Sequence, residues 1–133
     1  MNPKYPFVAD RARHRCEYCH APEEGFNFHF EIEHIVPLTL GGLNEYFNLA
    51  LACTACNLFK WIYIVGFDVV TQAEVPLFDP RQQSWEDHFR ADQATGEIEG
   101  LTATARATIA CLRINSPAQL RARRLWIAQG LFS

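Results

Sequence analysis

The sequence predicts one α+β domain, and three observations support that fold class. The 133 residues are 49% hydrophobic and 20% charged, a balance that suits a single globular unit with a modest core. The run FNFHFEIEH, residues 26–34, alternates apolar and polar side chains with the period of two typical of a half-buried strand. Two helix starts, Thr102 and Ser116-Pro117, and a stop at Gly130 predict helices at the end of the chain.

The first half of the chain contains the other short elements that we expect. A helix over residues 6–15 precedes the alternating strand, and two consecutive glycines mark a loop after it. NLALA, residues 48–52, predicts a second short strand. Thr54 is a suitable cap for a helix that runs to about Lys60. A strand, a loop, a second strand and a helix are therefore expected to follow one another.

The second half is expected to support these elements. Residues 61–70 are strongly apolar and fit either a continued helix or a strand. Ser84 begins a capping box, SWED, ahead of a short helix. ATGEIEG, residues 94–100, predicts a turn or a hairpin. The helix that Thr102 caps is expected to end near Arg113.

Charge and hydropathy argue against two classes of protein. The net charge is −3, so the chain lacks the basic character of a protein that coats nucleic acid. No apolar run approaches the ~18 residues of a membrane span, and the first residues lack the apolar core of a signal peptide. We therefore expect no membrane association and a cytoplasmic location. Arginines nevertheless gather locally, which predicts a basic surface for the phosphates of a nucleic-acid backbone. They are Arg11, Arg13 and Arg15 before the first cysteine pair, and Arg121, Arg123 and Arg124 near the end.

Four of the five cysteines form two C-x-x-C pairs, CEYC and CTAC. The pairs, Cys16 with Cys19 and Cys53 with Cys56, are separated by residues 20–52. Two such knuckles supply the four thiolates of a closed tetrahedral site, in which zinc is structural. Four unconnected core cysteines, or a redox C-x-x-C, fit the paired spacing less well. Zinc is therefore expected to be part of the fold, in a reducing compartment.

Glu33 and His34 are adjacent at the tip of the first strand, where packing alone requires neither. The Glu33 carboxylate offers a hard oxygen ligand for Mg²⁺ or Mn²⁺, and the His34 imidazole can act as a general base near neutral pH. Asn57 adds an amide oxygen for the same ion. Lys60 lies three residues further along the same helix face, where it can reach a phosphate. With Asn48 at the start of the second strand, these side chains are expected to converge.

The segment EHIVPLTLGGLNEYFNLALACTACNLFK, with CEYCH upstream, resembles the HNH endonuclease family. The family pattern is an acidic residue or His followed by His, then I-x-P, a Gly-rich loop, Asn-Leu, and C-x-x-C followed by His or Asn and a Lys. The resemblance to this family implies a ββα-metal fold with a zinc knuckle at the base of the fold. VPLFDPRQQSWEDHF, GLTATARATIACLRINSP and LRARRLWIAQGLF resemble small stand-alone bacterial HNH proteins. We expect residues 1–133 to be one HNH nuclease domain, with 16–60 as its core and 61–133 as a supporting segment.

The resemblance implies a role for each matching residue. Glu33 takes the position of the first metal ligand, and His34 that of the general base. Asn48 takes the place of the central Asn, which holds the loop around the histidine. Asn57 occupies the last metal position, where many relatives have His, and Lys60 matches the final Lys. Because Glu33 and His34 are placed at a strand tip, replacing either is expected to cost little stability.

The activity that the resemblance implies is metal-dependent hydrolysis of phosphodiester bonds in DNA. Mg²⁺ or Mn²⁺ is the expected catalytic ion, and the arginines before the first knuckle are expected to hold the backbone. The alternative is a catalytically weak or inactive module that binds or assembles on a zinc-supported scaffold.

Residues 61–70 depart from the family, whose members continue with small and polar residues after the final Lys. In extended form, Trp61, Tyr63 and Val65 share one face of the segment, and two isoleucines share the other. Some of these apolar side chains must then face outward. An edge strand of this kind predicts a homodimer through Trp61–Val70, unless the C-terminal helices cover it.

Overall fold

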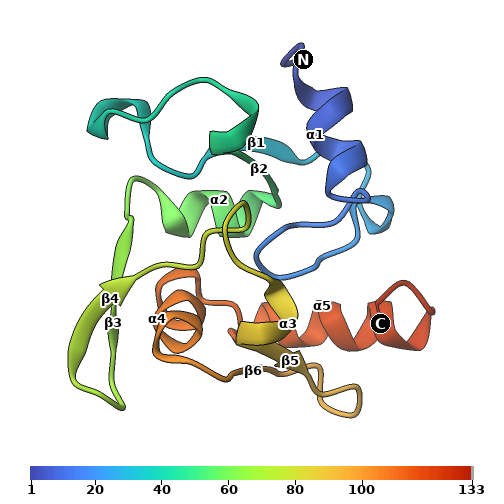
Figure 1. Ribbon diagram of the computed structural model, residues 1–133. Helices are drawn as coiled ribbons and strands as arrows, with labels where there is room; N and C mark the ends of the chain where they lie inside the picture. The colour runs from blue at the N-terminus through green and yellow to red at the C-terminus, as the bar shows by residue number, and fades with distance from the viewer. Residues whose placement is uncertain (133) are drawn as a thin grey trace.

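The protein is built from two groups of short elements, one above the other in the view of Figure 1. The computed structural model describes residues 1–132. The upper group contains α1 (Tyr5–Arg11), β1 (Glu31–His34), β2 (Leu49–Ala52) and α2 (Thr54–Lys60). The lower group contains α3 (Trp85–His88), β5 (Phe89–Ala91), β6 (Ile98–Gly100), α4 (Ala103–Leu112) and α5 (Pro117–Ala128). A hairpin of β3 (Val65–Asp68) and β4 (Ala73–Pro76) lies beside α4, at the left in Figure 1.

The antiparallel β1–β2 hairpin and α2 form the ββα arrangement that the sequence predicts. In its register Glu33 faces Ala50 and His34 faces Leu49. All four residues of β2 are buried, because this strand lies between α1 and the cysteine cluster. The connection between β1 and β2 contains two short 3₁₀ turns, η2 (Leu38–Leu40) and η3 (Tyr46–Asn48).

The first strand is shorter than the alternation predicts, since only residues 31–34 pair with β2. The Phe26 ring instead packs edge-on against Phe30, with ring centroids 4.9 Å apart, and lies 5.7 Å from the Trp126 ring of α5. These contacts draw the preceding residues out of the strand and over the C-terminal helix. Phe30 is buried, and Phe26 and Ile32 are partly buried, but Phe28 is exposed. Tertiary packing therefore decided which residues of the run form a strand and which of its apolar side chains face inward.

Two helix bounds also differ from the prediction. The first helix ends at Arg11 rather than at residue 15, and Arg13 and His14 both adopt the left-handed conformation with φ of 56° and 55°. Cys53 rather than Thr54 caps α2, because the Cys53 sulfur accepts a hydrogen bond from the backbone N–H of Cys56 at 3.4 Å. A cysteine of the second C-x-x-C pair therefore also satisfies the start of the helix.

The C-terminal elements follow the sequence signals closely. Thr102 caps α4 by accepting from the N–H of Ala105 at 3.1 Å, and Ser116 caps α5 in the same way. Residues 89–100 form the predicted hairpin, β5–β6. Ser84 does precede α3, but its hydroxyl bonds Glu86 and makes no cap to the helix backbone.

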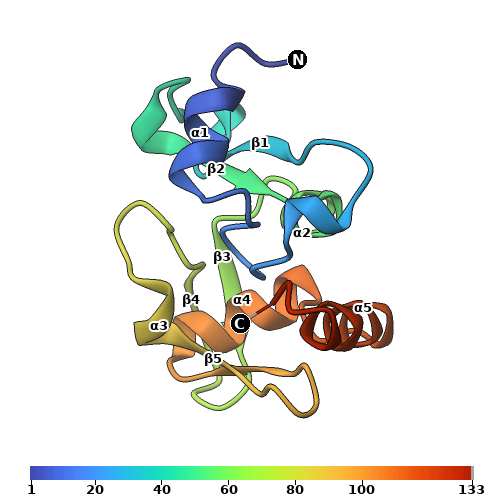
Figure 2. The same ribbon diagram turned by 90° about the vertical axis from the view of Figure 1, so that its right-hand side faces the viewer.

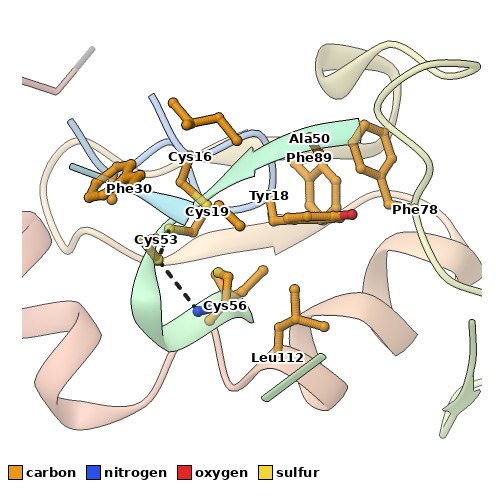
Figure 3. Packing of buried hydrophobic residues seen from close by; sticks show 14 of the residues in the cluster. Cys16, Tyr18, Cys19, Phe30, Ala50, Cys53, Cys56, Phe78, Phe89 and Leu112 are labelled. Atoms are coloured by element: carbon orange, nitrogen blue, oxygen red, sulfur yellow. Dashed lines mark hydrogen bonds between the residues drawn. The ribbon is translucent and has the colours of Figure 1, made fainter. Parts of the chain in front are cut away.

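One hydrophobic core connects the two groups of elements. It includes the four paired cysteines, strand β2, and side chains of the lower group such as Phe89, Leu112 and Trp126. Figure 3 shows these aromatic and aliphatic groups next to the cysteines. Within residues 1–132, no helix has the length and apolar character needed to cross a bilayer.

The β3–β4 hairpin leaves one apolar face uncovered. A Cβ on Gly66 would meet Leu77 and Ala107, and Asp68 is fully buried against Arg106, so these residues face α4. Val65 and Phe67 alternate with them and point outward. Helix α4 therefore covers one face of the hairpin and leaves the other face exposed. Its exposed large side chains are Trp61, Ile62, Tyr63, Ile64, Val65, Phe67, Val69 and Val70, which are 38–67% exposed.

We predict that this hairpin face mediates self-association. Three exposed aromatic rings leave on the order of 300 Å² of apolar surface, and the aliphatic side chains raise it toward the ~800 Å² that each partner of a standard interface buries. The double variant Val65→Lys/Phe67→Lys should shift sedimentation of a wild-type dimer to monomer without unfolding. Leu125→Lys, on an exposed position of α5, is the matched control. A wild-type protein that sediments as a monomer at tens of micromolar contradicts the prediction.

Candidate active site and metal centre

The two cysteine pairs meet in the core and form one tetrad. Cys16 and Cys19 come from the turn after α1, and Cys53 and Cys56 from the start of α2. Their four sulfur atoms all lie within 4.8 Å of one another, and the Cys19 and Cys53 sulfurs are 3.7 Å apart (Figure 3). Tetrahedral zinc with Zn–S bonds of about 2.3 Å requires sulfurs about 3.8 Å apart. The tetrad therefore has the ligands and spacing of the predicted zinc site.

The tetrad is buried, with each cysteine at most 3% exposed. Hydrogen bonding to Cys16 lowers the pKa of Cys19 and raises the pKa of Cys53 and Cys56. Four crowded thiols cannot all ionise without a cation among them. A zinc ion bound among the four sulfurs would resolve this conflict, because it stabilises the thiolate form of each ligand.

Arg123 is a buried cation behind the tetrad. We expected it on a basic surface with its neighbours in α5, and that expectation is wrong. Its side chain is fully buried, and its guanidinium donates to the carbonyls of Gly96 at 2.7 Å and Ile114 at 2.8 Å. Burial lowers the pKa of Arg123, while the charges of Cys19 and its partners raise it. The guanidinium thus links α5 to the tetrad electrostatically.

The Glu33 carboxylate points inward from β1, toward α2. It accepts a hydrogen bond from the Tyr18 hydroxyl at 2.6 Å, and the Lys60 ammonium lies 3.1 Å from one of its oxygens. Lys60 also donates to the carbonyl of Ile35 at 2.8 Å. Both charged side chains are almost fully buried, at 3% and 1% exposed. Burial raises the pKa of Glu33, and the Lys60 charge opposes that shift.

This geometry corrects two expectations. Lys60 does not project to the surface, where it would reach a phosphate, because it is an internal partner of Glu33. Glu33 is not a freely replaceable residue at a strand tip, because its removal would leave a buried ammonium without a counter-ion.

The oxygen donors around this position suit a hard divalent ion. Glu31 lies on the same side of β1 as Glu33, and the Asn57 amide nitrogen donates to the Glu31 carboxylate at 3.2 Å. Carboxylate and amide oxygens, which these residues supply from β1 and α2, are ligands that Mg²⁺ or Mn²⁺ can bind. A divalent ion at Glu33 would compete with the Lys60 ammonium. Within residues 1–132, the tetrad is the one group of three or more His, Cys, Asp or Glu residues placed to hold a metal ion.

His34 ends β1 and is partly exposed. Its Nε2 lies 3.0 Å from the Asn44 side-chain oxygen. The loop that carries Asn44 is held by Asn48, whose amide accepts from the N–H of Val36 and donates to the carbonyls of Val36 and Leu43, each at 2.9 Å. Asn48 is thus a buried residue at the end of η3 that holds the loop after β1.

Gly42, in the loop between β1 and β2, packs closely against the backbone of Val36. A Cβ at this position would lie 1.8 Å from the carbonyl oxygen of Val36. A side chain there would push the loop away from the Asn48 clamp. The glycine is therefore required by close backbone approach rather than by flexibility.

The three arginines before the first knuckle have different surroundings. The Arg11 guanidinium donates to the carbonyls of Tyr46 at 2.9 Å and Leu49 at 2.7 Å. Burial lowers the pKa of Arg11. Arg13 is exposed, and Arg15 is partly buried. They therefore do not form one uniform row of free cations.

The sequence reasoning missed three residues of this site: Tyr18, Glu31 and Asn44. Tyr18 lies inside the first C-x-x-C pair, and its hydroxyl points away from the sulfurs in Figure 3, toward Glu33. Strand alternation places Glu31 on the face of Glu33, so this residue was detectable. Nothing in the local pattern indicated that Asn44 would reach His34 across the loop.

Comparison with known families now adds an independent finding. Residues 16–60 match the HNH endonuclease family. The matched HNH segment runs from the first cysteine of the tetrad to Lys60, so it contains the ββα unit, the tetrad, His34 and Asn48. No curated protein and no solved structure matches the chain. The predicted α+β fold class, with a four-cysteine cluster and C-terminal helices, is confirmed.

We predict that zinc is required for the HNH segment to stay folded. Cys53→Ser removes a zinc ligand, while the serine hydroxyl can still cap α2, and binding energy at a structural zinc site is folding energy. The melting temperature of the Cys53→Ser variant should fall sharply below that of wild type. Elemental analysis of the wild type should give one zinc per chain. Cys111→Ser, which alters the cysteine outside the tetrad, should change neither value. A zinc-free wild type of equal stability would refute this.

We predict that Glu33 and His34 differ strongly in their effect on stability. Glu33→Gln strands the buried Lys60 ammonium and should lower the free energy of unfolding by about 3 kcal/mol or more. His34→Ala removes a partly exposed ring and should change it by less than about 1 kcal/mol. Urea denaturation of the zinc-loaded variants measures both. If Glu33→Gln lowered the free energy of unfolding by as little as His34→Ala, the Glu33–Lys60 pair would not support the fold.

Proposed function

We propose that the protein is a metal-dependent HNH endonuclease that hydrolyses phosphodiester bonds in DNA. The observation that carries the proposal is the placement of His34 within the matched segment. The imidazole is accessible at the end of β1 and is held by Asn44 on a loop that Asn48 clamps. A histidine that served packing alone would not need these polar supports at an accessible position.

In this proposal the neutral imidazole of His34 donates from Nε2 to the Asn44 side-chain oxygen, which lies 3.0 Å away. Nδ1 is then unprotonated and can take a proton from an attacking water. Asn44 and Asn48 are positioning residues in this proposal, because they fix the ring and the loop without touching the reacting atoms.

The proposal includes Mg²⁺ or Mn²⁺, with Glu33 and Asn57 as its protein ligands. When bound, such an ion would stabilise negative charge that develops on the phosphate. The chain contributes carboxylate and amide oxygens from β1 and α2, and it must release Glu33 from Lys60 to do so. Arg13 and Arg15 would contact phosphates, which orients the backbone and carries little sequence specificity.

The second candidate is a zinc-supported binding or assembly module without catalysis. The buried Glu33–Lys60 pair favours this second candidate, because Lys60 already contacts the carboxylate that the proposed metal ion would need. The exposed hairpin face of residues 61–70 offers such a module a contact surface.

A plasmid-nicking assay separates the two candidates. Zinc-loaded wild type with added Mg²⁺ or Mn²⁺ should convert supercoiled plasmid to the open circle. His34→Ala should slow this conversion by about a hundredfold or more, because general-base catalysis contributes at least that factor. His29→Ala, an exposed histidine just before β1, is the control and should stay active. Wild-type cleavage that persists unchanged in His34→Ala would remove the assignment, and an inactive wild type would favour the binding module.

A further inference from the structure

An aromatic cluster with two cations lies on the surface next to the proposed catalytic histidine. The rings of Phe7 on α1 and Tyr46 on the η3 turn are in contact, with centroids 4.6 Å apart. The Lys4 ammonium lies 4.7 Å from the Tyr46 ring centroid, and the Arg11 guanidinium lies 5.4 Å from that of Phe7. With Phe47, the next residue of the turn, these residues are called the aromatic platform below.

The aromatic platform is tied to the strand that carries the site. Arg11 donates to the carbonyl of Leu49 at 2.7 Å, and Leu49 is the residue opposite His34 in the β1–β2 register. The η3 turn ends at Asn48, the clamp of the loop around His34. Figure 2 shows α1 beside this turn, at the same end of the molecule as the strand pair. The platform and His34 thus share one rigid support.

The rings of the platform are open to solvent. Phe7 is 53% exposed, Tyr46 is 40% exposed and Phe47 is 66% exposed. They contribute little to the core, since none of them is buried. The Lys4 ammonium lies over one face of the Tyr46 ring and the Arg11 guanidinium over one face of the Phe7 ring. Exposed rings combined with cations are suited to a planar base with its phosphate.

Charge decides which form of nucleic acid fits this surface. A duplex presents two strands of phosphates and hides the faces of its bases, so its affinity comes mainly from many cation–phosphate contacts. The platform has two cations, one of which already donates to two carbonyls, and the chain has a net charge of −3. Unpaired nucleotides offer their base faces, and stacking then supplies affinity that does not depend on a high positive charge.

We propose that the aromatic platform binds unpaired nucleotides, and that the proposed nuclease site favours DNA with a single-stranded segment over fully paired DNA. Phe7 and Phe47 stack against bases, and Lys4 contacts a neighbouring phosphate, while Arg11 holds the platform on Tyr46 and Leu49. The platform thereby guides the strand toward His34. The role of the platform as a substrate site rests on the proposed endonuclease function. Binding of the single strand is measured without cleavage.

The test is fluorescence anisotropy with the full-length zinc-loaded protein and no added Mg²⁺ or Mn²⁺. The probes are a labelled 12-nucleotide single strand and the blunt duplex of the same sequence. Wild type should bind the single strand at least tenfold more tightly than the duplex. Phe7→Ala and Phe47→Ala should each weaken single-strand binding by about tenfold, which corresponds to the loss of one stacked base.

Phe28→Ala is the matched control, because Phe28 is also 53% exposed but lies outside the platform. Its affinity for the single strand should equal that of wild type. Phe47 has the most exposed ring of the platform, so its variant should fold even if Phe7→Ala does not, and thermal melting checks both. Equal or tighter duplex binding, wild-type affinity in Phe47→Ala, a comparable loss in Phe28→Ala, or no binding to either probe would each overturn the proposal. His34-dependent nicking would still stand in those cases, so the two ideas fail separately.

Discussion

The convergence of four cysteines from two distant segments is the constraint on which the rest of the structure depends. The tetrad joins the turn after α1 to the start of α2, so the 33 residues between the pairs, 20–52, form a closed loop. Strands β1 and β2 lie inside that loop, and Cys53 also caps α2. One set of sulfur positions therefore sets where the strand pair and the helix face each other. The C-terminal helices complete the enclosure, with Arg123 as a buried positive charge next to the thiols.

A conflict between folding and catalysis centres on Glu33. A metal ligand should be open to an ion and to water, yet this carboxylate is buried between Tyr18 and Lys60. A buried ion pair is sensitive to the loss of either partner, so the pair holds β1 against α2. If an ion uses Glu33, it must compete with an ammonium that the fold has already placed. The proposed catalytic residue His34 belongs to no buried ion pair, because it is partly exposed and contacts Asn44 of the loop.

The surface differs from that of a protein that recognises duplex DNA by charge. Arg11 is engaged with backbone carbonyls, and Arg123 is in the core. Apolar groups take their place at two locations, the outer face of the β3–β4 hairpin and the ring cluster beside His34. Affinity on such surfaces comes from burial of apolar area and from stacking, with screened electrostatics as a minor contribution.

Local patterns in the sequence determined the two cysteine pairs, the ββα order and the two C-terminal helix starts. Each depends on residues close in the chain or on a fixed spacing, which is why they are legible without a structure. Tertiary structure alone decided which charges are buried. Lys60 and Arg123 look like surface cations in sequence, and only the packing of α2 on β1 and of α5 on the tetrad takes them out of water. The same holds for the end of the first strand, where contact between Phe26 and Trp126, a hundred residues apart in sequence, overrides the alternating pattern.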